Sequence, residues 1–450
     1  MEKNLNMTQG KPLKLLFSFA LPLMCGNVFQ QLYTVVDTAI VGRGVGLDAL
    51  AALGTVDWLN WMLLGLAQGF SQGFSVKIAQ KYGEGDLLEL KHVIGQSSRL
   101  SVYIAVAFTL LSQLGLPLFL KMLRVPDELW GMAELYTRIL MGGLAAVVFY
   151  NFCAAVLRAV GDSKTPLKAM VVASVTNIVL DYIAVFHLGM GIAGAAAATV
   201  FSQCLSGVIC AYQMIRTPEL HFGKEHLRSE TDMQIALLRL GAPVAAKNVI
   251  VALGGIAIQT VVNGFGMAFI AGVTATNKLY GLLEIAALSY GYAVTTYVGQ
   301  NYGASRFDRI KTGMKAAAVL SFVTGTLIAA VMLMFGRPIT MLFISSDSEL
   351  LMAEAGNTAY LYLCAMSVCL PVLHLLYAYQ AALQGMGNMI IPMISAIMEL
   401  CVRVGLAVLV AVTGYEYGIF GAEVGAWLCG ALFLGVNYYR RITRGDLGED

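Results

Sequence analysis

Two acidic residues stand inside long apolar stretches of this chain, where an acidic side chain is costly. Asp37 lies in the apolar run 15–41, and Asp181 lies in the apolar run 167–187. A charge at the centre of a membrane-spanning helix costs roughly 2.5–3.5 kcal/mol on insertion scales, so such residues usually face a polar cavity and act there. Burial and a second carboxylate nearby both favour the protonated form of a carboxyl group. The two acids therefore predict a site for a proton or a hard monovalent cation.

Other oxygen-bearing side chains accompany the acids at helical spacing. Gln30 and Tyr33 precede Asp37 at intervals that place all three on one face of a helix. Asn177 precedes Asp181 by about one turn on a second helix. Two further polar residues in apolar sequence are Asn151 and Thr199. We expect one polar pocket in the N-terminal half. Purely structural acids are the less favoured alternative, because this half has no buried Lys or Arg to match them.

The composition is that of an integral membrane protein. Of the 450 residues, 58% are hydrophobic and only 12% are charged, whereas soluble domains carry roughly 25% charged residues. The net charge of +2 gives no indication of a nucleic-acid partner. The eight cysteines lie in apolar runs without a CxxC motif, so we expect free thiols. The sequence shows no P-loop and no nucleophile–His–acid set, so we expect neither an enzyme nor a cofactor.

Apolar runs of about 20 residues or more, the length that spans a membrane, recur along the whole sequence. Such runs are too long for the strands of a membrane barrel, so we expect helices. The sequence predicts twelve spans, at residues 15–41, 50–75, 93–120, 130–157, 167–187, 190–214, 236–263, 269–298, 312–336, 354–383, 390–413 and 417–438.

Lys and Arg are distributed unevenly between the two sides of this predicted topology. They are abundant at the N-terminus and in the regions 77–99, 158–168, 216–239, 306–315 and 440–444. The loops on the other side carry only Arg43, Lys121, Arg124 and Arg337. Because basic loops stay in the cytoplasm, we expect a multi-pass protein of the inner or plasma membrane with both termini cytoplasmic.

The two halves of the sequence resemble one another. Three short motifs recur at a nearly constant distance: Pro22 and Asn27 as Pro243 and Asn248, the stretch 80–83 as 300–303, and the stretch 157–166 as 383–392. We therefore expect two six-helix lobes, 1–214 and 239–450, joined by a cytoplasmic linker at 215–238. Such parallel repeats are related by a pseudo-twofold axis along the membrane normal. Rocking of the lobes about a cleft between them would give alternating access.

The second half lacks the two acids. The positions that correspond to them in the repeat are apolar: Ile258 and Ala407. Glu399 and Arg403 lie one helical turn apart in one span, so we expect a structural ion pair there. Glu284 either neutralises Lys278 or binds a cationic substrate. His374 is expected to be a hydrogen-bonded core residue rather than a proton carrier, and Lys247 has no assigned role.

The motifs taken together resemble the MATE family, the multidrug and toxic compound extrusion transporters. The residues that carry the resemblance extend over the chain: Pro22, Asn27, Gln30, Tyr33, Asp37, 41–43, 50–54, 157–162, Asn177, Asp181 and 298–304. The resemblance implies twelve helices in two six-helix lobes that export organic cations against an inward flow of H⁺ or Na⁺. It also implies that bending of the first helix at Pro22 is linked to protonation. The N-lobe cation site of the DinF-like branch would comprise Asp37, Asp181, Asn177 and Thr199.

Two departures from the family pattern bear on these expectations. The NorM-like branch has an Asp in the tenth span, whereas residues 370–377 of this chain contain none, so coupling through the N-lobe alone is favoured. Ala154 stands where some relatives carry a second Asn after Asn151, so the details of drug binding are expected to differ.

We therefore predict a secondary antiporter that exports amphipathic, often cationic xenobiotics in exchange for H⁺ or Na⁺, coupled through the N-lobe acids. Residues expected at the substrate cavity or the helix bend are Pro22, Gln30, Tyr33, Asn151 and Glu284. If Na⁺ is the coupling ion, its predicted ligands are Asp37, Asn177, Asp181 and Thr199. We expect a monomer in the lipid bilayer, with no nucleic-acid partner. The alternatives are a flippase for a lipid-linked saccharide from the same broader superfamily, and a receptor or scaffold, which would not need the acids.

Overall fold

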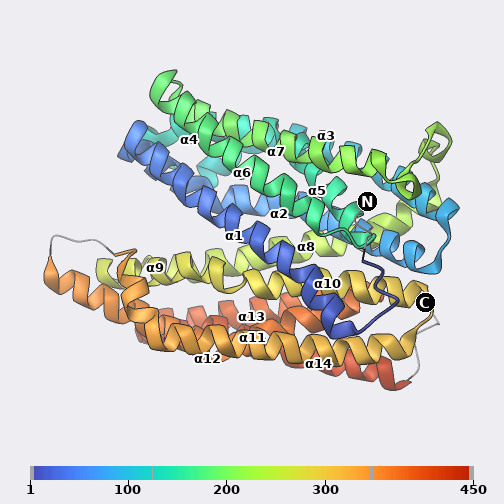
Figure 1. Cartoon of the computed structure of the whole chain (residues 1–450). Coiled ribbons are helices and arrows are strands. Elements are labelled where there is room, and N and C mark those ends of the chain that lie inside the picture. The colour runs from blue at the N-terminus through green and yellow to red at the C-terminus, as the bar shows by residue number, and fades with distance from the viewer. Residues whose placement is uncertain (1–4, 124, 345–347, 445–450) are drawn as a thin grey trace. The chain divides into compact units, whose positions relative to one another are not determined.

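The protein is helical throughout the part that the structure describes. The structure is a computed structural model covering residues 5–123, 125–344 and 348–444. Within these ranges, helices follow one another with short connections, and no strand occurs (Figure 1). Lipid offers the backbone no hydrogen-bond partner, so a spanning segment must satisfy its own peptide groups, as a helix does. The predicted all-α membrane architecture is confirmed.

The helices are long, and short π or 3₁₀ turns lie between some of them. The first half contains α1 (Pro12–Gly44), α2 (Leu47–Glu84), α3 (Leu87–Met122), α4 (Asp127–Gly142), α5 (Leu144–Ala159), α6 (Lys164–Tyr182), the π-turn η1 (Ile183–His187) and α7 (Gly191–Arg216). The second half contains η2 (Pro218–Leu220), η3 (Lys224–Leu227), α8 (Thr231–Val262), α9 (Met267–Leu283), α10 (Ile285–Gly303), α11 (Phe307–Met341), α12 (Glu349–Gly385), α13 (Ile390–Thr413), η4 (Glu416–Ile419) and α14 (Phe420–Arg444).

The predicted spans coincide with these helices. Nine helices of the described chain are long and apolar enough to cross a membrane, and two bent pairs raise the number to eleven. The bent pairs are the two parts of α2, at 45°, and α4 with α5, at 43°. The remaining predicted span, 269–298, falls on α9 and α10, which meet at Glu284. Each predicted segment thus lies on one helix or on consecutive helices.

The chain divides into two compact units, as far as the structure describes it. The first unit comprises Met1–Asn6 with Leu21–Asn248, and the second comprises Met7–Ala20 with Val249–Asp450. The division crosses α1 next to Pro22, although α1 remains one continuous helix there. It also crosses α8 after Asn248. This division differs from the predicted lobes, 1–214 and 239–450, and the lobe boundaries stay a prediction.

The first half of α8 belongs to the first unit because it packs closely on α2. A Cβ atom on Gly73 would lie only 2.4 Å from the Cα atom of Gly241, so this approach requires glycine. The connection before α8 is held in the same unit, since Gln96 of α3 donates a hydrogen bond to the carbonyl of His226 at 2.9 Å. Leu220 of this connection is buried in the apolar core with Phe74 of α2. These contacts explain why residues 215–248 group with the first unit.

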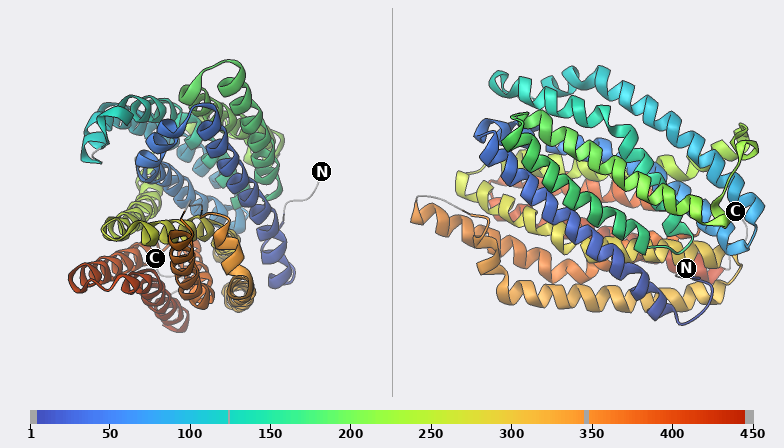
Figure 2. Two further views of the ribbon diagram at one scale, coloured as in Figure 1. Left: turned by 90° about the vertical axis from the view of Figure 1, so that its left-hand side faces the viewer. Right: turned by 45° about the horizontal axis from the view of Figure 1, so that its top comes forward.

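Within the first unit, α7 is packed between neighbours that also carry the candidate site. It contacts α4, α5 and α6, while α2 contacts α3, α4 and α5. In the second unit, α12 contacts α9, α10, α11 and α14, and α13 packs on α14. The helices of each unit run side by side as a bundle (Figure 1 and Figure 2). Met7 is fully buried in the second unit, where Asn301 donates to its carbonyl at 3.0 Å.

Candidate functional site

The two predicted acids meet inside the first unit. Asp37 of α1 is 9% exposed and Asp181 of α6 is fully buried. Their carboxyl groups are close enough to interact with each other. Beyond that mutual contact, one oxygen of Asp37 and both oxygens of Asp181 are buried without a hydrogen-bond partner. Neither acid forms an ion pair with a Lys, Arg or His in the described part of the chain. Buried polar atoms are normally satisfied, so these oxygens suit a proton, an ion or water.

The local helix geometry around Asp181 is unusual. The α-helical part of α6 ends at Tyr182 and the chain continues as the π-turn η1. Single π-turns within helices are rare and are frequent at functional sites. Two tyrosines, Tyr33 of α1 and Tyr136 of α4, are near enough to the acid pair to interact with it electrostatically. Tyr136 and the π-turn were not predicted, because neither follows from the spacing of polar residues.

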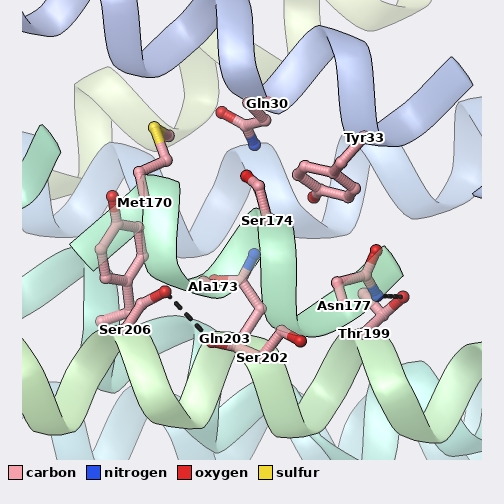
Figure 3. Close-up of a pocket in the computed structure, with 11 residues that line it drawn as sticks. Gln30, Tyr33, Met170, Ala173, Ser174, Asn177, Thr199, Ser202, Gln203 and Ser206 are labelled. Atoms are coloured by element: carbon pink, nitrogen blue, oxygen red, sulfur yellow. Dashed lines mark hydrogen bonds between the residues drawn. The ribbon is translucent and has the colours of Figure 1, made fainter. Parts of the chain in front are cut away.

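Asn177 and Thr199 lie together, as the resemblance implies. The Asn177 side-chain amide donates to the Thr199 hydroxyl oxygen at 3.4 Å (Figure 3). This hydroxyl donates to the carbonyl of Ala195 at 3.1 Å. The amide oxygen of Asn177 is buried and accepts no hydrogen bond. One turn of α6 separates Asn177 from Asp181, so a free amide oxygen is placed on the helix that also carries the buried acid.

A small pocket between α1, α5, α6 and α7 is lined by several of the predicted residues. Gln30 and Tyr33 point from α1 toward Ser174 of α6 (Figure 3). The cavity volume is about 30 Å³. This exceeds the roughly 10–15 Å³ that one water molecule needs, and it is far below the roughly 300–1,000 Å³ of a drug-sized pocket. The lining residues are Gln30, Tyr33, Tyr150, Met170, Ala173, Ser174, Asn177, Thr199, Ser202, Gln203 and Ser206.

Several pocket residues are not among the predicted ones. Ser174 lies one turn before Asn177, and Ser202 lies one turn after Thr199, so both extend a predicted polar face. This spacing is the signal that would have found them. In contrast, the predicted Asn151 does not line the pocket; its amide donates to the carbonyl of Val147 in its own helix at 2.9 Å.

The second unit contains a different polar cluster. Arg403 donates from two nitrogen atoms to one carboxylate oxygen of Glu423, at 3.1 and 3.0 Å. The predicted pair of Arg403 with Glu399 is present, with a longer separation of 3.8 Å. Ser395 donates to Glu399 at 3.0 Å. Glu423 was not predicted as a partner because it lies on α14, outside the sequence neighbourhood of Arg403.

The remaining predicted residues of the second unit lie apart from this cluster or at its edge. Glu284, at the junction of α9 and α10, accepts a hydrogen bond from Tyr377 at 3.3 Å. Lys278 is exposed and forms no ion pair within the described residues, so its suggested pairing with Glu284 is not observed. His374 is fully buried, and its Nδ1 atom bonds to the carbonyl of Leu370 at 3.0 Å, as expected for a core histidine.

Comparison with known proteins assigns the chain to a family. The family model MatE matches residues 22–183 and 243–409. The two matched segments begin at Pro22 and Pro243, which correspond to each other in the internal repeat. Both halves thus match the same model, in agreement with that repeat.

Individual relatives match over most of the chain. A probable multidrug resistance protein, YoeA of Bacillus subtilis (strain 168), is 30% identical over 346 residues, which is 75% of this chain and 74% of the relative. The probable multidrug resistance protein NorM of Thermotoga maritima is 25% identical over 416 residues, which is 92% of this chain and 88% of the relative. A crystal structure of a MATE protein in complex with MaL6 superimposes with a TM-score of 0.91 at 25% identity and covers 100% of both chains. The chain therefore belongs to the MATE family, and it is a multi-pass membrane transporter rather than an enzyme.

Proposed function

We propose that the protein is a secondary antiporter that exports amphipathic, often cationic compounds in exchange for inward H⁺ or Na⁺. The observation that carries the proposal is the buried pair Asp37 and Asp181. Beyond the contact of the two carboxyl groups with each other, one oxygen of Asp37 and both oxygens of Asp181 have no hydrogen-bond partner, and neither acid has an ion-paired cation in the described chain. Membership of the MATE family and the multidrug-resistance names of the relatives support drug export. Buried carboxylates are costly unless they are neutralised, so a pair without a neighbouring Lys or Arg must take up a proton or a cation from solution. An antiporter needs such an exchangeable ion for coupling.

The coupling step is proposed to depend on neutralisation of the acid pair. A proton or Na⁺ bound there favours one arrangement of the transporter, and bound drug favours the other. Each ligand shifts this equilibrium only by the difference in its affinity for the two states. The described residues contain no cluster of three or more His, Cys, Asp or Glu side chains that could hold a metal ion. Na⁺ would therefore be held by Asp37, Asp181 and the neutral oxygens of Asn177 and Thr199.

The proposed substrate contacts are distributed over polar side chains that are not needed to hold the ion. Gln30, Tyr33 and Asn151 are proposed to contact substrate from the first unit. Glu284 is proposed to contact a cationic group from the second unit. Pro22 lacks a backbone N–H and so weakens α1 at its position, which is the proposed bend.

The proposed setting follows from the charge distribution. Both termini and the basic loops are proposed to face the cytoplasm, and the membrane is proposed to be the inner or plasma membrane. The protein is proposed to act as a monomer.

The test is efflux of a fluorescent cationic dye from proteoliposomes under an imposed pH gradient or an imposed Na⁺ gradient. Wild type is compared with Asp37→Asn and Asp181→Asn, and the exposed acid variant Glu128→Gln is the matched control. We expect gradient-driven efflux to be lost in both buried-acid variants and retained in the control. The gradient that drives the wild type identifies the ion.

Two outcomes would contradict the proposal. Coupled efflux that survives in both buried-acid variants would remove the acids from the mechanism. An absence of dye movement under either gradient would favour the flippase alternative, and a lipid-linked saccharide would then be tested as substrate.

A further inference from the structure

The pocket of the first unit is lined by an excess of unsatisfied polar atoms. Ser174 is 3% exposed and Ser202 is 5% exposed, and neither hydroxyl oxygen has a hydrogen-bond partner. The side-chain oxygens of Asn177 and Gln203 are also buried without a partner. All four side chains line the same cavity of about 30 Å³. More than about 90% of buried polar groups are normally satisfied, so this concentration of exceptions points to bound water or a bound ion.

These side chains are arranged in successive turns rather than around one point. On α6, Ser174, Asn177 and Asp181 follow one another at intervals of one helical turn. On α7, Thr199 is followed by Ser202 and then by Ser206 at similar intervals. At about 1.5 Å of rise per residue, the two turns from Asp181 to Ser174 correspond to about 10 Å along the helix axis.

The two series are paired across the helix interface. Asn177 donates to Thr199, which fixes the register of α6 against α7. The chain reverses direction between these helices. The turn of α6 that precedes Asn177 and carries Ser174 therefore lies beside the turn of α7 that follows Thr199 and carries Ser202. In Figure 3 the side chains extend from Asn177 and Thr199 at one end to Ser206 and Met170 at the other. The series therefore leads from the acid pair toward the ends of α6 and α7 near Lys164 and Arg216, which the charge distribution assigns to the cytoplasm.

The chemistry of the lining suits passage of an ion rather than permanent binding. Hydroxyl groups both donate and accept hydrogen bonds, and amide oxygens accept them, so with water they can relay a proton or replace part of the hydration shell of Na⁺. None of the lining side chains carries a fixed charge. The Ser206 hydroxyl donates to the carbonyl of Ser202 at 3.1 Å, whereas the hydroxyls of Ser174 and Ser202 have no such partner and can rotate.

We infer that Ser174, Ser202 and Gln203 form the centre of a hydrated track inside the first unit, along which the coupling ion passes between the acid pair and the cytoplasmic end. This inference rests on the proposed antiport function. A cavity of this size admits water or a small cation and excludes a drug-sized molecule. The drug therefore does not enter the part of the cavity around Ser174, Ser202 and Gln203, and this part can be blocked without changing the affinity for the drug.

The decisive comparison is between two double variants of the full-length protein in proteoliposomes. Ser174→Val/Ser202→Val removes both hydroxyls, and Ser174→Thr/Ser202→Thr adds the same bulk but keeps them. Dye efflux and counterflow of the coupling ion are measured together, the latter with an internal pH dye or with radioactive Na⁺. We expect coupled flux about tenfold slower in the Val variant, because the bound water loses two partners, and within about twofold of wild type in the Thr variant. Dye affinity in detergent should change less than about twofold in both.

Equal slowing in the Val and Thr variants would overturn the inference, because bulk rather than the hydroxyl groups would then be responsible. Unchanged flux in both would overturn it as well. Asp37→Asn measured under the same conditions distinguishes failure of the antiport proposal from failure of the track. If this variant keeps coupled efflux, the antiport proposal itself fails; if it loses coupled efflux while the Val variant keeps it, only the track fails.

Discussion

Helix α6 of the first unit and helix α13 of the second are related by the internal repeat, yet their polar sites differ in how charge is balanced. The match of 157–166 with 383–392, continued along the two helices, places Arg403 at the position of Asn177. In the second unit this arginine binds Glu423 at 3.0 Å and Glu399 at 3.8 Å. In the first unit a neutral amide stands near two buried acids that have no ion-paired cation in the described chain.

The difference shows how a duplicated scaffold can keep one exchangeable site. A guanidinium group is always charged and cannot leave, so the carboxylates around it are neutralised permanently. The acids of the first unit must obtain their proton or cation from solution. The space for the arginine is provided by Gly254, since a Cβ atom there would lie 2.9 Å from Cδ of Arg403. When Pro22 is aligned with Pro243, Gly254 corresponds to Tyr33, which lines the ion pocket of the first unit.

The largest effect on dye efflux is expected when an arginine, as in the second unit, is placed beside the two acids of the first unit. Tyr33→Gly/Asn177→Arg reproduces the arrangement of the second unit beside Asp37 and Asp181. We expect gradient-driven dye efflux to fall to the rate of protein-free liposomes, because the acids would be neutralised permanently. Tyr33→Gly alone is the control for lost side-chain volume. Coupled efflux in the double variant at wild-type rates would show that an exchangeable cation at the acid pair is not required.

The converse change removes the fixed cation from the second unit. Arg403→Gln leaves Glu399 and Glu423 without their guanidinium, and breaking a buried ion pair in this way costs roughly 3–5 kcal/mol of unfolding free energy. Chemical unfolding in detergent micelles measures the loss. Adding Glu399→Gln and Glu423→Gln should recover much of the stability, because the uncompensated charges are then absent. A single variant as stable as wild type would mean that the cluster is not a buried charge network.

Binding of the coupling ion should raise the Tm of the protein. A ligand that binds only the folded protein at about 100 times its Kd stabilises it by roughly 2.7 kcal/mol. We therefore expect either added Na⁺ at constant ionic strength or added protons to raise the Tm of wild type relative to that of Asp181→Asn. The cluster around Arg403 in the second unit should not make the Tm depend on Na⁺ or on protons, because its cation is a side chain that cannot exchange with solution. Superimposable melting curves of wild type and variant in both titrations would argue against an exchangeable site.

Hydropathy and helical spacing predicted the elements and most of one site. The spans follow from apolar runs, and the shared helical face of Gln30, Tyr33 and Asp37 follows from the helical period. A shared polar pocket for Asn177 and Thr199 was expected from polar residues in apolar sequence, and the family resemblance assigned both to one cation site. The hydrogen bond between them was not predicted, because a pairing between different helices has no signal in local spacing. For the same reason the partnership of Arg403 with Glu423, which lies on the following helix, was not foreseen.

Two further features depend on packing that the sequence pattern does not encode. Ser174 and Ser202 lie at helical spacing from Asn177 and Thr199, but serine is common in apolar helices, so only the packing of α6 on α7 shows that both line one cavity. The division of the chain inside α1 and α8 was also not foreseen, since both helices are continuous in hydropathy. It results from close contacts such as that between Gly73 and Gly241.

The smallest effect on coupling is expected when the neutral hydroxyl oxygen of Thr199 is removed. Its hydrogen bond from Asn177 is long, at 3.4 Å, so its loss should cost no more than the roughly 0.5–1.5 kcal/mol of an ordinary hydrogen bond. Thr199→Val should therefore raise the half-saturating concentration of the coupling ion about threefold to tenfold without abolishing efflux, and Thr199→Ser should stay near wild type. Complete loss of coupling in the Val variant would instead place Thr199 on a par with the acids. The ion site would then not depend mainly on its charged ligands. The contrast between the acids of the first unit and the arginine cluster of the second unit would then no longer hold.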